Sequence, residues 1–444
     1  MKQIYPNSSV IAKLNAYFDP YCAKLSKPTA VNFFWLMLAI IVLGCARSVR
    51  FMYEHFLRWH RPRSLNAYYY SLSYAKHREK LQFWQITEHA LLKLIPHELR
   101  NVPICVIVDD TLCPKWGKHF EHVKTLFDHA DHDGRPYKTG HCFVTIMMAV
   151  PVGQTKDGEL KWLAVPLQHR MWVSGGKSKL EIAKDGIEAL HPVLDASAHV
   201  ILLFDSWYAK QPLLSLREAW PQLDIICAVR IDTAMYGLPP ARTGKRGRPR
   251  KRGERIRPDD IALSDFGISG YKGGSLTVLT KLFGDLKVTA CVTKPVSGGG
   301  TRRLYLSTIT PEALSLLLKP VQTCPAPCAP VHLYMCRWNI ETCYLQIKAY
   351  WDLCSYRVRS AEAIELLINI EAVVYSAMLI LPYLWSDLSH MRDSSPQEVR
   401  MTIGRAVQQE LFFGDLLTNA EKCEKRESVR NALRSLVRKL CKAS

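Results

Sequence analysis

The alternation of apolar and polar residues divides the 444-residue chain into a helical beginning, an α/β middle and a helical end. In the first hundred residues, apolar positions recur with the spacing of a helix, which predicts helices over 33–42 and 81–94. The texture changes at Val102, where short uninterrupted apolar runs begin. Such runs, bounded by turn-forming residues, are typical of buried strands.

The middle of the chain alternates between these runs and segments of helical period. Strands are predicted at 102–108, 143–152, 162–171, 199–204 and 224–231, and helices at 177–190 and 211–220. Three strands followed by helix, strand, helix and strand predict an α/β sheet of mixed direction.

The later half of the chain changes character twice. A block rich in Gly, Pro and short β runs predicts a β-rich insertion, and helical spacing returns after it. We therefore expect a helical N-terminal domain (1–100) and a core in two parts (101–232 and 332–385). The β-rich insertion (233–331) separates these two parts, and a helical C-terminal region (386–444) follows the core.

Membrane and export signals are not predicted. The apolar run over 31–46 is shorter than the roughly 20 residues that a membrane-spanning helix needs. It also starts too far from the N-terminus for a signal peptide, so we interpret it as a buried helix. The 14 cysteines are scattered and suggest reduced thiols. These features predict a cytoplasmic protein with no membrane partner.

Basic residues are concentrated in three segments, although the chain as a whole has a net charge of +19. These segments are 1–63, 242–257 and 420–444, and the remainder is close to neutral. A near-neutral body with basic patches predicts a polyanionic partner, and without a membrane signal that partner is nucleic acid. The C-terminal patch has two alternatives, a solvated surface or a helix used for dimerisation.

The middle patch contains glycine and proline, which exclude a regular helix. Its Arg246-Gly247-Arg248-Pro249 core resembles an AT-hook, in which extended arginines lie in a narrow minor groove. An ordinary basic loop that neutralises phosphates is the alternative. In both cases the expected DNA contacts are Arg246, Arg248, Arg250, Lys251 and Arg252.

Carboxylates follow two of the predicted strands. Asp109 and Asp110 end the first strand, and Asp205 ends the strand at 199–204. Strand ends at one edge of an α/β sheet are where side chains meet ligands, and paired carboxylates suit a divalent metal ion. An aspartate that only forms a turn is the alternative for each position.

A helical stretch near residue 340 adds further chemistry. With about 100° per residue, one face spanning about 60° carries Tyr334, Arg337, Glu341 and Lys348. The ordinary polar face of an amphipathic helix is the alternative, but many of the neighbouring residues are apolar or aromatic. Two aspartates, one glutamate and nearby cations predict a two-metal site for phosphoryl transfer.

The spacing of these four residues resembles the YREK signature of insertion-sequence transposases of the IS4 group. The strand-end motifs Asp109-Asp110-Thr111 and Asp205-Ser206-Trp207-Tyr208 are similar to those of the same group, in particular its IS701-like members. The resemblance covers about 102–381. Outside this range only the general helical character agrees.

The resemblance implies a catalytic core of the RNase H-like, retroviral integrase-like fold, interrupted by the β-rich insertion. It implies a DDE triad of Asp109, Asp205 and Glu341 that chelates two Mg²⁺, for which Mn²⁺ is expected to substitute. Asp109 is preferred because the family's first aspartate usually stands two residues before Ser or Thr, as here before Thr111, but Asp110 stays open as the alternative. Tyr334, Arg337 and Lys348 would contact phosphates near the cleaved end.

The implied activity is that of a DNA transposase. The family hydrolyses DNA at the transposon's 3′ ends, often through a hairpin intermediate, and joins these ends to target DNA. The implied partners are double-stranded DNA, as terminal inverted repeats and target, and a second copy in a synaptic homodimer at the bacterial nucleoid.

One feature departs from the family. Members with a hairpin step stack a flipped base on a tryptophan of the insertion, whereas no tryptophan lies between Trp220 and Trp338 here. Either the step differs or another aromatic residue substitutes, the candidates being Phe266, Tyr271, Phe283 and Tyr305. His141 is a further candidate contact, with a structural histidine as the alternative.

Two other functions remain compatible with the sequence. One is a DNA-binding regulator without catalysis that descends from such an enzyme. The other is a structure-specific nuclease that never joins strands.

Overall fold

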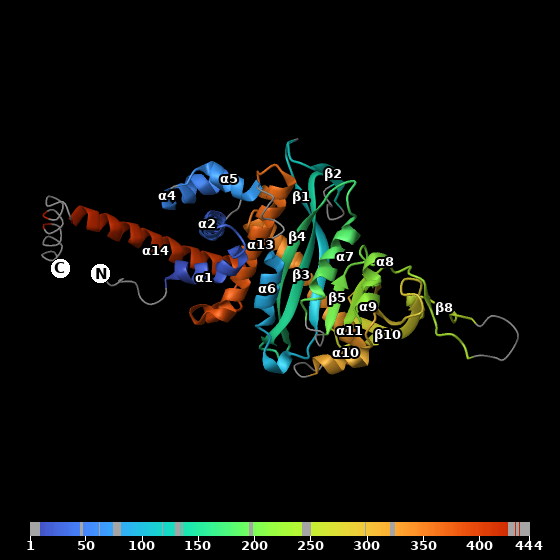
Figure 1. Ribbon diagram of the computed structural model, residues 1–444. Helices are drawn as coiled ribbons and strands as arrows, with labels where there is room; N and C mark the ends of the chain where they lie inside the picture. The colour runs from blue at the N-terminus through green and yellow to red at the C-terminus, as the bar shows by residue number, and fades with distance from the viewer. Residues whose placement is uncertain are drawn as a thin grey trace. The chain divides into compact units, whose positions relative to one another are not determined.

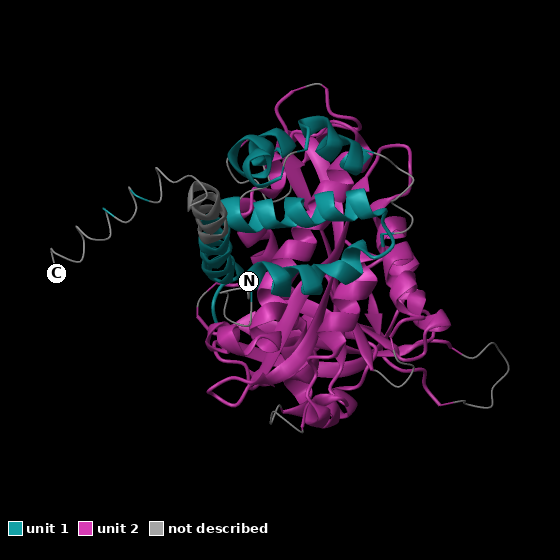
Figure 2. Cartoon of the chain, turned by 60° about the vertical axis from the view of Figure 1, so that its left-hand side comes forward, with its two compact units in different colours: residues 1–81, 393–444 teal, residues 82–392 magenta. Residues whose placement is uncertain are grey.

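The computed structural model describes most of the chain in two compact units. The residues described are 9–44, 48–61, 63–73, 81–117, 119–128, 134, 136–194, 199–241, 250–297, 299–319, 325–424, 431 and 435, with the backbone alone for 413–424. Unit 1 comprises 1–81 and 393–444, and unit 2 comprises 82–392 (Figure 2).

Unit 1 is helical and contains residues from both the beginning and the end of the sequence. Its helices are α1 (Val10–Cys22), α2 (Lys27–Leu43), α3 (Val49–Met52), α4 (Arg58–His60), α5 (Leu65–Ser73) and α14 (Pro396–Glu424). Helix α2 is apolar on all sides and ends at Gly44, which has a left-handed conformation (φ 69°). Helix α14 packs against α2 so closely that a Cβ atom at Gly404 would lie 2.9 Å from the Ile41 carbonyl oxygen.

Unit 2 is built on one mixed sheet. Its first strands, β1 (Ile104–Pro114), β3 (Tyr137–Gln154) and β4 (Leu160–Trp172), are antiparallel neighbours, and the short β2 (Lys124–Phe127) pairs with β3. Strand β5 (Val200–Phe204) lies parallel to β1, and β6 (Leu223–Val229) lies parallel to β5. This order, β4-β3-β1-β5-β6, confirms the expected α/β sheet of mixed direction.

The β-rich segment continues the same sheet. Strand β12 pairs antiparallel with β6, and the sheet extends from there through β11, β10, β7 and β8. The strands of this segment are β7 (Met235–Tyr236), β8 (Arg255–Ile256), β9 (Ser264–Asp265), β10 (Tyr271–Thr280), β11 (Lys287–Pro295) and β12 (Arg303–Ser307). Strand β5, which Asp205 follows, is therefore the direct neighbour of β6, the strand to which this segment is paired.

Helices cover both faces of the sheet in unit 2 (Figure 1). Helices α6 (Phe83–Leu92) and α13 (Ala361–Leu384) pack on β4, and α7 (Lys179–Leu190) packs on β3. The other helices of this unit are α8 (Gln211–Leu214), α9 (Leu216–Ala219), α10 (Pro311–Leu318), α11 (Ala329–Tyr334) and α12 (Trp338–Tyr350).

Among the described residues, α13 is the one helix whose length and composition would allow it to cross a membrane. However, 83% of its most apolar window is buried inside the protein, as in the core helix of a soluble protein. The run at 31–46 forms the shorter helix α2.

Glu88 on α6 is a carboxyl group buried in this core. Its side chain is nearly inaccessible, its Oε1 atom has no hydrogen-bond partner among the described residues, and burial raises its pKa to about 7. Because the folded protein holds this proton more tightly than the unfolded chain does, Glu88 costs increasing stability as pH rises from about 4.5 to about 7.

We therefore expect Glu88→Met to raise the free energy of unfolding at pH 8 by on the order of 1–3 kcal/mol. Below pH 4 the gain should be much smaller, because both states then carry a neutral carboxyl. Urea unfolding at both pH values checks this, and an equal or absent gain at pH 8 would contradict it.

Candidate active site

Two aspartates lie side by side, each directly after the paired residues of the neighbouring parallel strands β1 and β5. The β1–β5 ladder ends with the pair Val108 and Phe204, and the next residue on each strand is Asp109 and Asp205. Neighbouring strands lie about 5 Å apart, so the two carboxylates are close. Burial, followed by repulsion from Asp205, raises the pKa of Asp109 to about 7. Burial also raises the pKa of Asp205.

Strand β1 does not end at Asp109, contrary to the prediction, but continues to Pro114 through pairing with β3. Successive residues in a strand point to opposite faces of the sheet, so the side chains of Asp109 and Asp110 have different neighbours. Asp110 accepts hydrogen bonds from Lys179 Nζ (2.6 Å) and from the Tyr208 hydroxyl (2.9 Å). Asp109 instead lies beside Arg337.

Asp205 begins a tight turn at the end of β5. Its Oδ1 atom accepts the backbone N–H groups of Trp207 (3.0 Å) and Tyr208 (3.3 Å). The turn-forming alternative therefore describes this residue correctly, but it does not exclude a second role. One carboxylate oxygen is held by the backbone while the group still faces the site.

Arg337 links the carboxylates. Its guanidinium lies 3.5 Å from Asp109 Oδ2 and 2.5 Å from Glu341 Oε1, and the residue is buried. The Nε atom of Arg337 has no hydrogen-bond partner among the described residues. Arg337 is therefore a buried cation that contacts two carboxylates and keeps one N–H donor available.

The predicted single helix from 334 to 348 is interrupted. Tyr334 ends α11, Met335–Arg337 forms a 3-10 turn, and α12 begins at Trp338. A 3-10 turn advances about 120° per residue instead of about 100°, so these three residues rotate α12 by only about 60° relative to a continuous α-helix. Tyr334 is buried and donates to the Phe204 carbonyl (3.3 Å), whereas Lys348 is exposed near the other end of α12.

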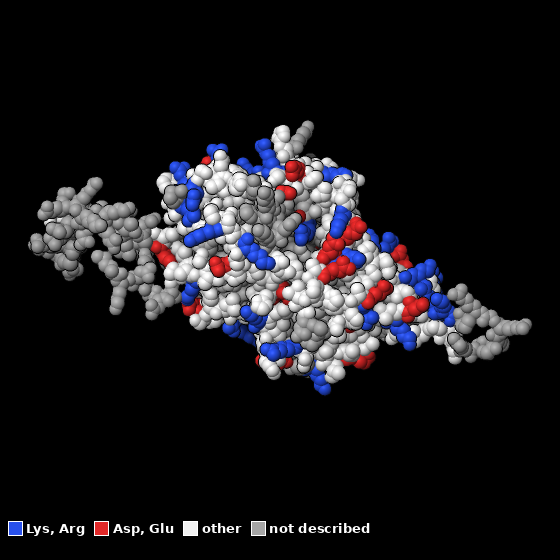
Figure 3. Space-filling model, viewed as in Figure 1, with Lys and Arg blue, Asp and Glu red and all other residues white. Residues whose placement is uncertain are grey.

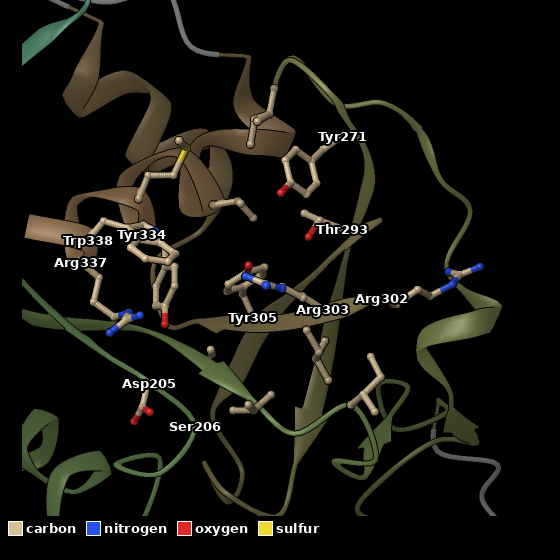
Figure 4. A pocket seen from close by; sticks show the side chains of 17 residues that line it. Asp205, Ser206, Tyr271, Thr293, Arg302, Arg303, Tyr305, Tyr334, Arg337 and Trp338 are labelled. Atoms are coloured by element: carbon tan, nitrogen blue, oxygen red, sulfur yellow. The ribbon is translucent and has the colours of Figure 1, made fainter. Parts of the chain in front are cut away.

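A cleft of about 390 Å³ opens beside Asp205 (Figure 4). Tyr334, Arg337 and Trp338 approach it from one side, and β12 contributes Arg303 and Tyr305. Two of the four aromatic candidates from the sequence, Tyr271 and Tyr305, line it, and Phe266 and Phe283 do not.

Trp338 and Arg303 are cleft residues that the sequence analysis missed. Trp338 directly follows Arg337 but was counted only as an apolar neighbour, although 53% of it is exposed. Arg303 begins a strand and carried no recognisable signal.

The basic loop is described in part. Arg246 and Arg248 lie outside the described residues, whereas Arg250, Lys251 and Arg252 lie just before β8. Lys251 approaches Asp285 (3.8 Å), and the guanidinium of Arg252 lies over the Tyr236 ring. Figure 3 shows basic side chains, with some acidic ones among them, at this end of unit 2.

His141 has a structural environment. It is buried, and its ring nitrogens contact the Tyr356 hydroxyl (2.6 Å) and the Glu121 carbonyl (2.8 Å). Burial lowers its pKa. Both ring nitrogens are engaged within the protein, which favours the structural alternative.

The chemistry of the carboxylates fits a divalent cation. Burial and, after it, the neighbouring charge of Asp205 disfavour the ionised form of Asp109 and raise its pKa, and a bound cation would offset both effects. Carboxylate oxygens are also the ligands that Mg²⁺ prefers. Within the described part of the chain, no three His, Cys, Asp or Glu side chains form a ready-made metal cluster. Glu341 is paired with Arg337.

A family model described as DDE superfamily endonuclease matches residues 35–266, which is more than half of the chain. The protein belongs to the DDE superfamily of endonucleases. The matched range contains Asp109 and Asp205 and ends before Glu341. A comparison with curated proteins found no match.

Membership of the superfamily gives the site a chemistry. DDE endonucleases act on DNA with divalent metal ions, typically Mg²⁺, and their domain fits an RNase H-like core. The mixed sheet of unit 2, with two aspartates on adjacent strands, is consistent with such a core.

We expect the affinity of this endonuclease for Mg²⁺ to rise steeply between pH 6 and pH 7 and to level off above pH 8. The pKa of Asp109 is about 7, so below this pH the metal must displace a proton, which costs up to about tenfold in affinity per pH unit. Isothermal titration of the DNA-free protein in buffers of different ionisation enthalpy would measure both the affinity and the proton release. An affinity that does not change across this range would contradict the expectation.

Proposed function

We propose that this DDE endonuclease is the transposase of an insertion sequence of the IS4 group. In this proposal it cleaves DNA at the inverted repeats of its element and joins the resulting 3′ ends to target DNA. The observation that carries the proposal is the pair Asp109 and Asp205, side by side after the paired residues of two parallel strands, with Asp109 linked through Arg337 to Glu341.

Asp109, Asp205 and Glu341 are the proposed metal ligands, and Asp110 is assigned no ligand role because Lys179 and Tyr208 already engage it. When bound, two Mg²⁺ ions activate the attacking oxygen and stabilise the leaving oxygen of an in-line displacement. Glu341 would have to leave Arg337 in order to serve as a ligand.

Arg337 has the largest role among the proposed DNA contacts at the site. Its guanidinium compensates the carboxylates in the free enzyme, and its donors suit phosphate oxygens once metal ions supply that compensation. Tyr334 holds the end of β5 through Phe204, which supports Asp205 from the neighbouring helix. Lys348, exposed about two helical turns beyond Glu341, would contact a more distant phosphate.

The cleft beside Asp205 suits a distorted DNA end. Aromatic rings and Arg303 line it, which would allow a base to stack while its phosphates are neutralised. A hairpin intermediate held here by Tyr271, Tyr305 or Trp338 is therefore part of the proposal.

The remaining parts are assigned by charge. The basic loop, including Arg246, Arg248, Arg250, Lys251 and Arg252, would bind duplex DNA, as would the helical region 1–100. The region 386–444 would serve dimerisation or DNA contact in a synaptic homodimer. The proposed location is the bacterial cytoplasm, at the nucleoid.

The decisive experiment uses the DNA that flanks the gene. Linear DNA ending in the element's inverted repeats is incubated with the protein, Mg²⁺ and a supercoiled plasmid, and the products are separated on a gel. We expect cleaved ends and joined molecules. Cleavage without joining would indicate a nuclease that does not transfer strands, and binding without cleavage would indicate a regulator.

A further inference from the structure

A second aromatic feature lies next to Asp205 but outside the cleft. Trp207 follows Asp205 by two residues, and 37% of it is exposed, whereas the cleft wall includes Asp205 and Ser206 but not Trp207. The Nζ atoms of Lys210 and Lys179 lie 4.3 Å and 5.2 Å from the centre of its ring. The surface there presents an indole with two ammonium groups over its ring.

The indole is held in a fixed position. The backbone N–H of Trp207 donates to Asp205, and the next residue, Tyr208, is buried and donates its hydroxyl to Asp110. The rings of Trp207 and Tyr208 meet edge to face with their centres 4.9 Å apart. The turn therefore has both its backbone and its neighbouring side chain anchored.

One of the two cations is anchored by the same group. Lys179 at the start of α7 donates to Asp110 Oδ2 (2.6 Å), while Tyr208 donates to Oδ1 of the same carboxylate. Asp110 thus fixes both Lys179 and the turn that carries Trp207. This gives the second aspartate of the Asp109-Asp110 pair a positioning role on the other face of β1.

This cluster has the chemistry of a site for an unpaired nucleotide. An exposed aromatic ring stacks on a base of any sequence. The ammonium group of Lys210, which lies over the ring, would then turn to a neighbouring phosphate and neutralise it. The interior of a duplex offers no free base face, so the preferred ligand is a base that has left its pair. Two residues span at most about 7 Å, which places this base within one or two nucleotides of a phosphate held at Asp205.

We propose that Lys179, Trp207 and Lys210 bind an unpaired nucleotide of the DNA strand adjacent to the phosphate that is cut. The proposal rests on the proposed function, because it assumes that a DNA strand crosses the site at Asp205. It adds a stacking position that is separate from the cleft lined by Tyr271 and Tyr305.

The test compares Trp207→Ala with the unchanged protein on two DNA duplexes. Both carry the element end, one fully paired and one with 2-aminopurine in a mismatch next to the cleavage position. In Ca²⁺, used as a metal that supports binding, we expect the unchanged protein to quench the 2-aminopurine fluorescence. Trp207→Ala should lose the quenching and bind the mismatched DNA about tenfold more weakly, which corresponds to the loss of one stacked base.

Matched variants separate stacking from general damage. Trp207→Phe should retain most of the affinity, because it keeps a ring. Trp116→Ala, which removes another tryptophan of unit 2 that is 95% exposed, should have no effect. Lys210→Gln should weaken binding less than Trp207→Ala and reduce its dependence on salt.

The outcomes distinguish this inference from the proposed function. If the unchanged protein neither cleaves nor joins the element ends, the proposed function fails. If it cleaves and joins them while Trp207→Ala quenches and binds like the unchanged protein, the stacking site alone is refuted.

Discussion

Replacing Asp205 with alanine should reduce metal-dependent DNA cleavage by about 1,000-fold or more and leave DNA affinity within about twofold. The substitution removes one of the two carboxylates that stand abreast at the β1–β5 ladder, so the metal ions lose a ligand. DNA binding depends mainly on basic residues elsewhere, which the substitution does not touch. Gel assays of cleavage and fluorescence anisotropy at a fixed salt concentration measure the two effects.

Asp232 offers a matched control for this experiment. It is also an aspartate of unit 2, but it is exposed and pairs with Arg230 on the surface. Asp232→Ala should cleave like the unchanged protein. Cleavage retained by Asp205→Ala would refute the assignment of the site.

Replacing Arg337 with methionine should have the largest effect on stability. The guanidinium is buried between Asp109 and Glu341, and its loss leaves their charges uncompensated. Removing one partner of a buried ion pair costs about 3–5 kcal/mol. We therefore expect a strong drop in the free energy of unfolding in metal-free buffer, together with a loss of cleavage.

Mg²⁺ separates this electrostatic effect from simple damage to packing. Because metal ions would replace the missing positive charge, Mg²⁺ should stabilise Arg337→Met more than it stabilises the unchanged protein. Thermal unfolding with and without Mg²⁺ measures this difference. Equal stabilisation of both proteins would contradict the role of Arg337 as a substitute for metal charge.

Arg230→Met provides the comparison for a surface pair. Arg230 and Asp232 are both exposed, so the loss of their contact should change stability by less than about 1 kcal/mol.

The buried strands could be predicted because burial on both faces gives an uninterrupted apolar run. The predicted runs before Asp109 and Asp205 coincide with the buried first half of β1 and with all of β5, to within two residues at their starts. The end of β1 could not be predicted in this way. Three polar residues, Asp109 to Thr111, look like a turn in sequence, yet pairing with β3 keeps them in the strand.

The interruption before α12 was also hidden from the sequence. Residues 329–350 keep a helical pattern, and a single 3-10 turn changes the period too little to be visible over three residues. The burial of Arg337 and Tyr334 was equally unpredictable, because it depends on the strands against which these helices pack. Periodicity placed Tyr334 and Lys348 together on one face, whereas Tyr334 is buried and Lys348 is exposed.

The composition of unit 1 has a consequence for biosynthesis. Helix α2, which is apolar on all sides, packs against α14, and some 350 residues separate the two in the chain. At the usual rate of about 5–20 residues per second, α2 leaves the ribosome tens of seconds before α14. During that interval its apolar surface lacks its native cover, so a nascent chain stalled before Pro396 should depend on chaperones for its solubility.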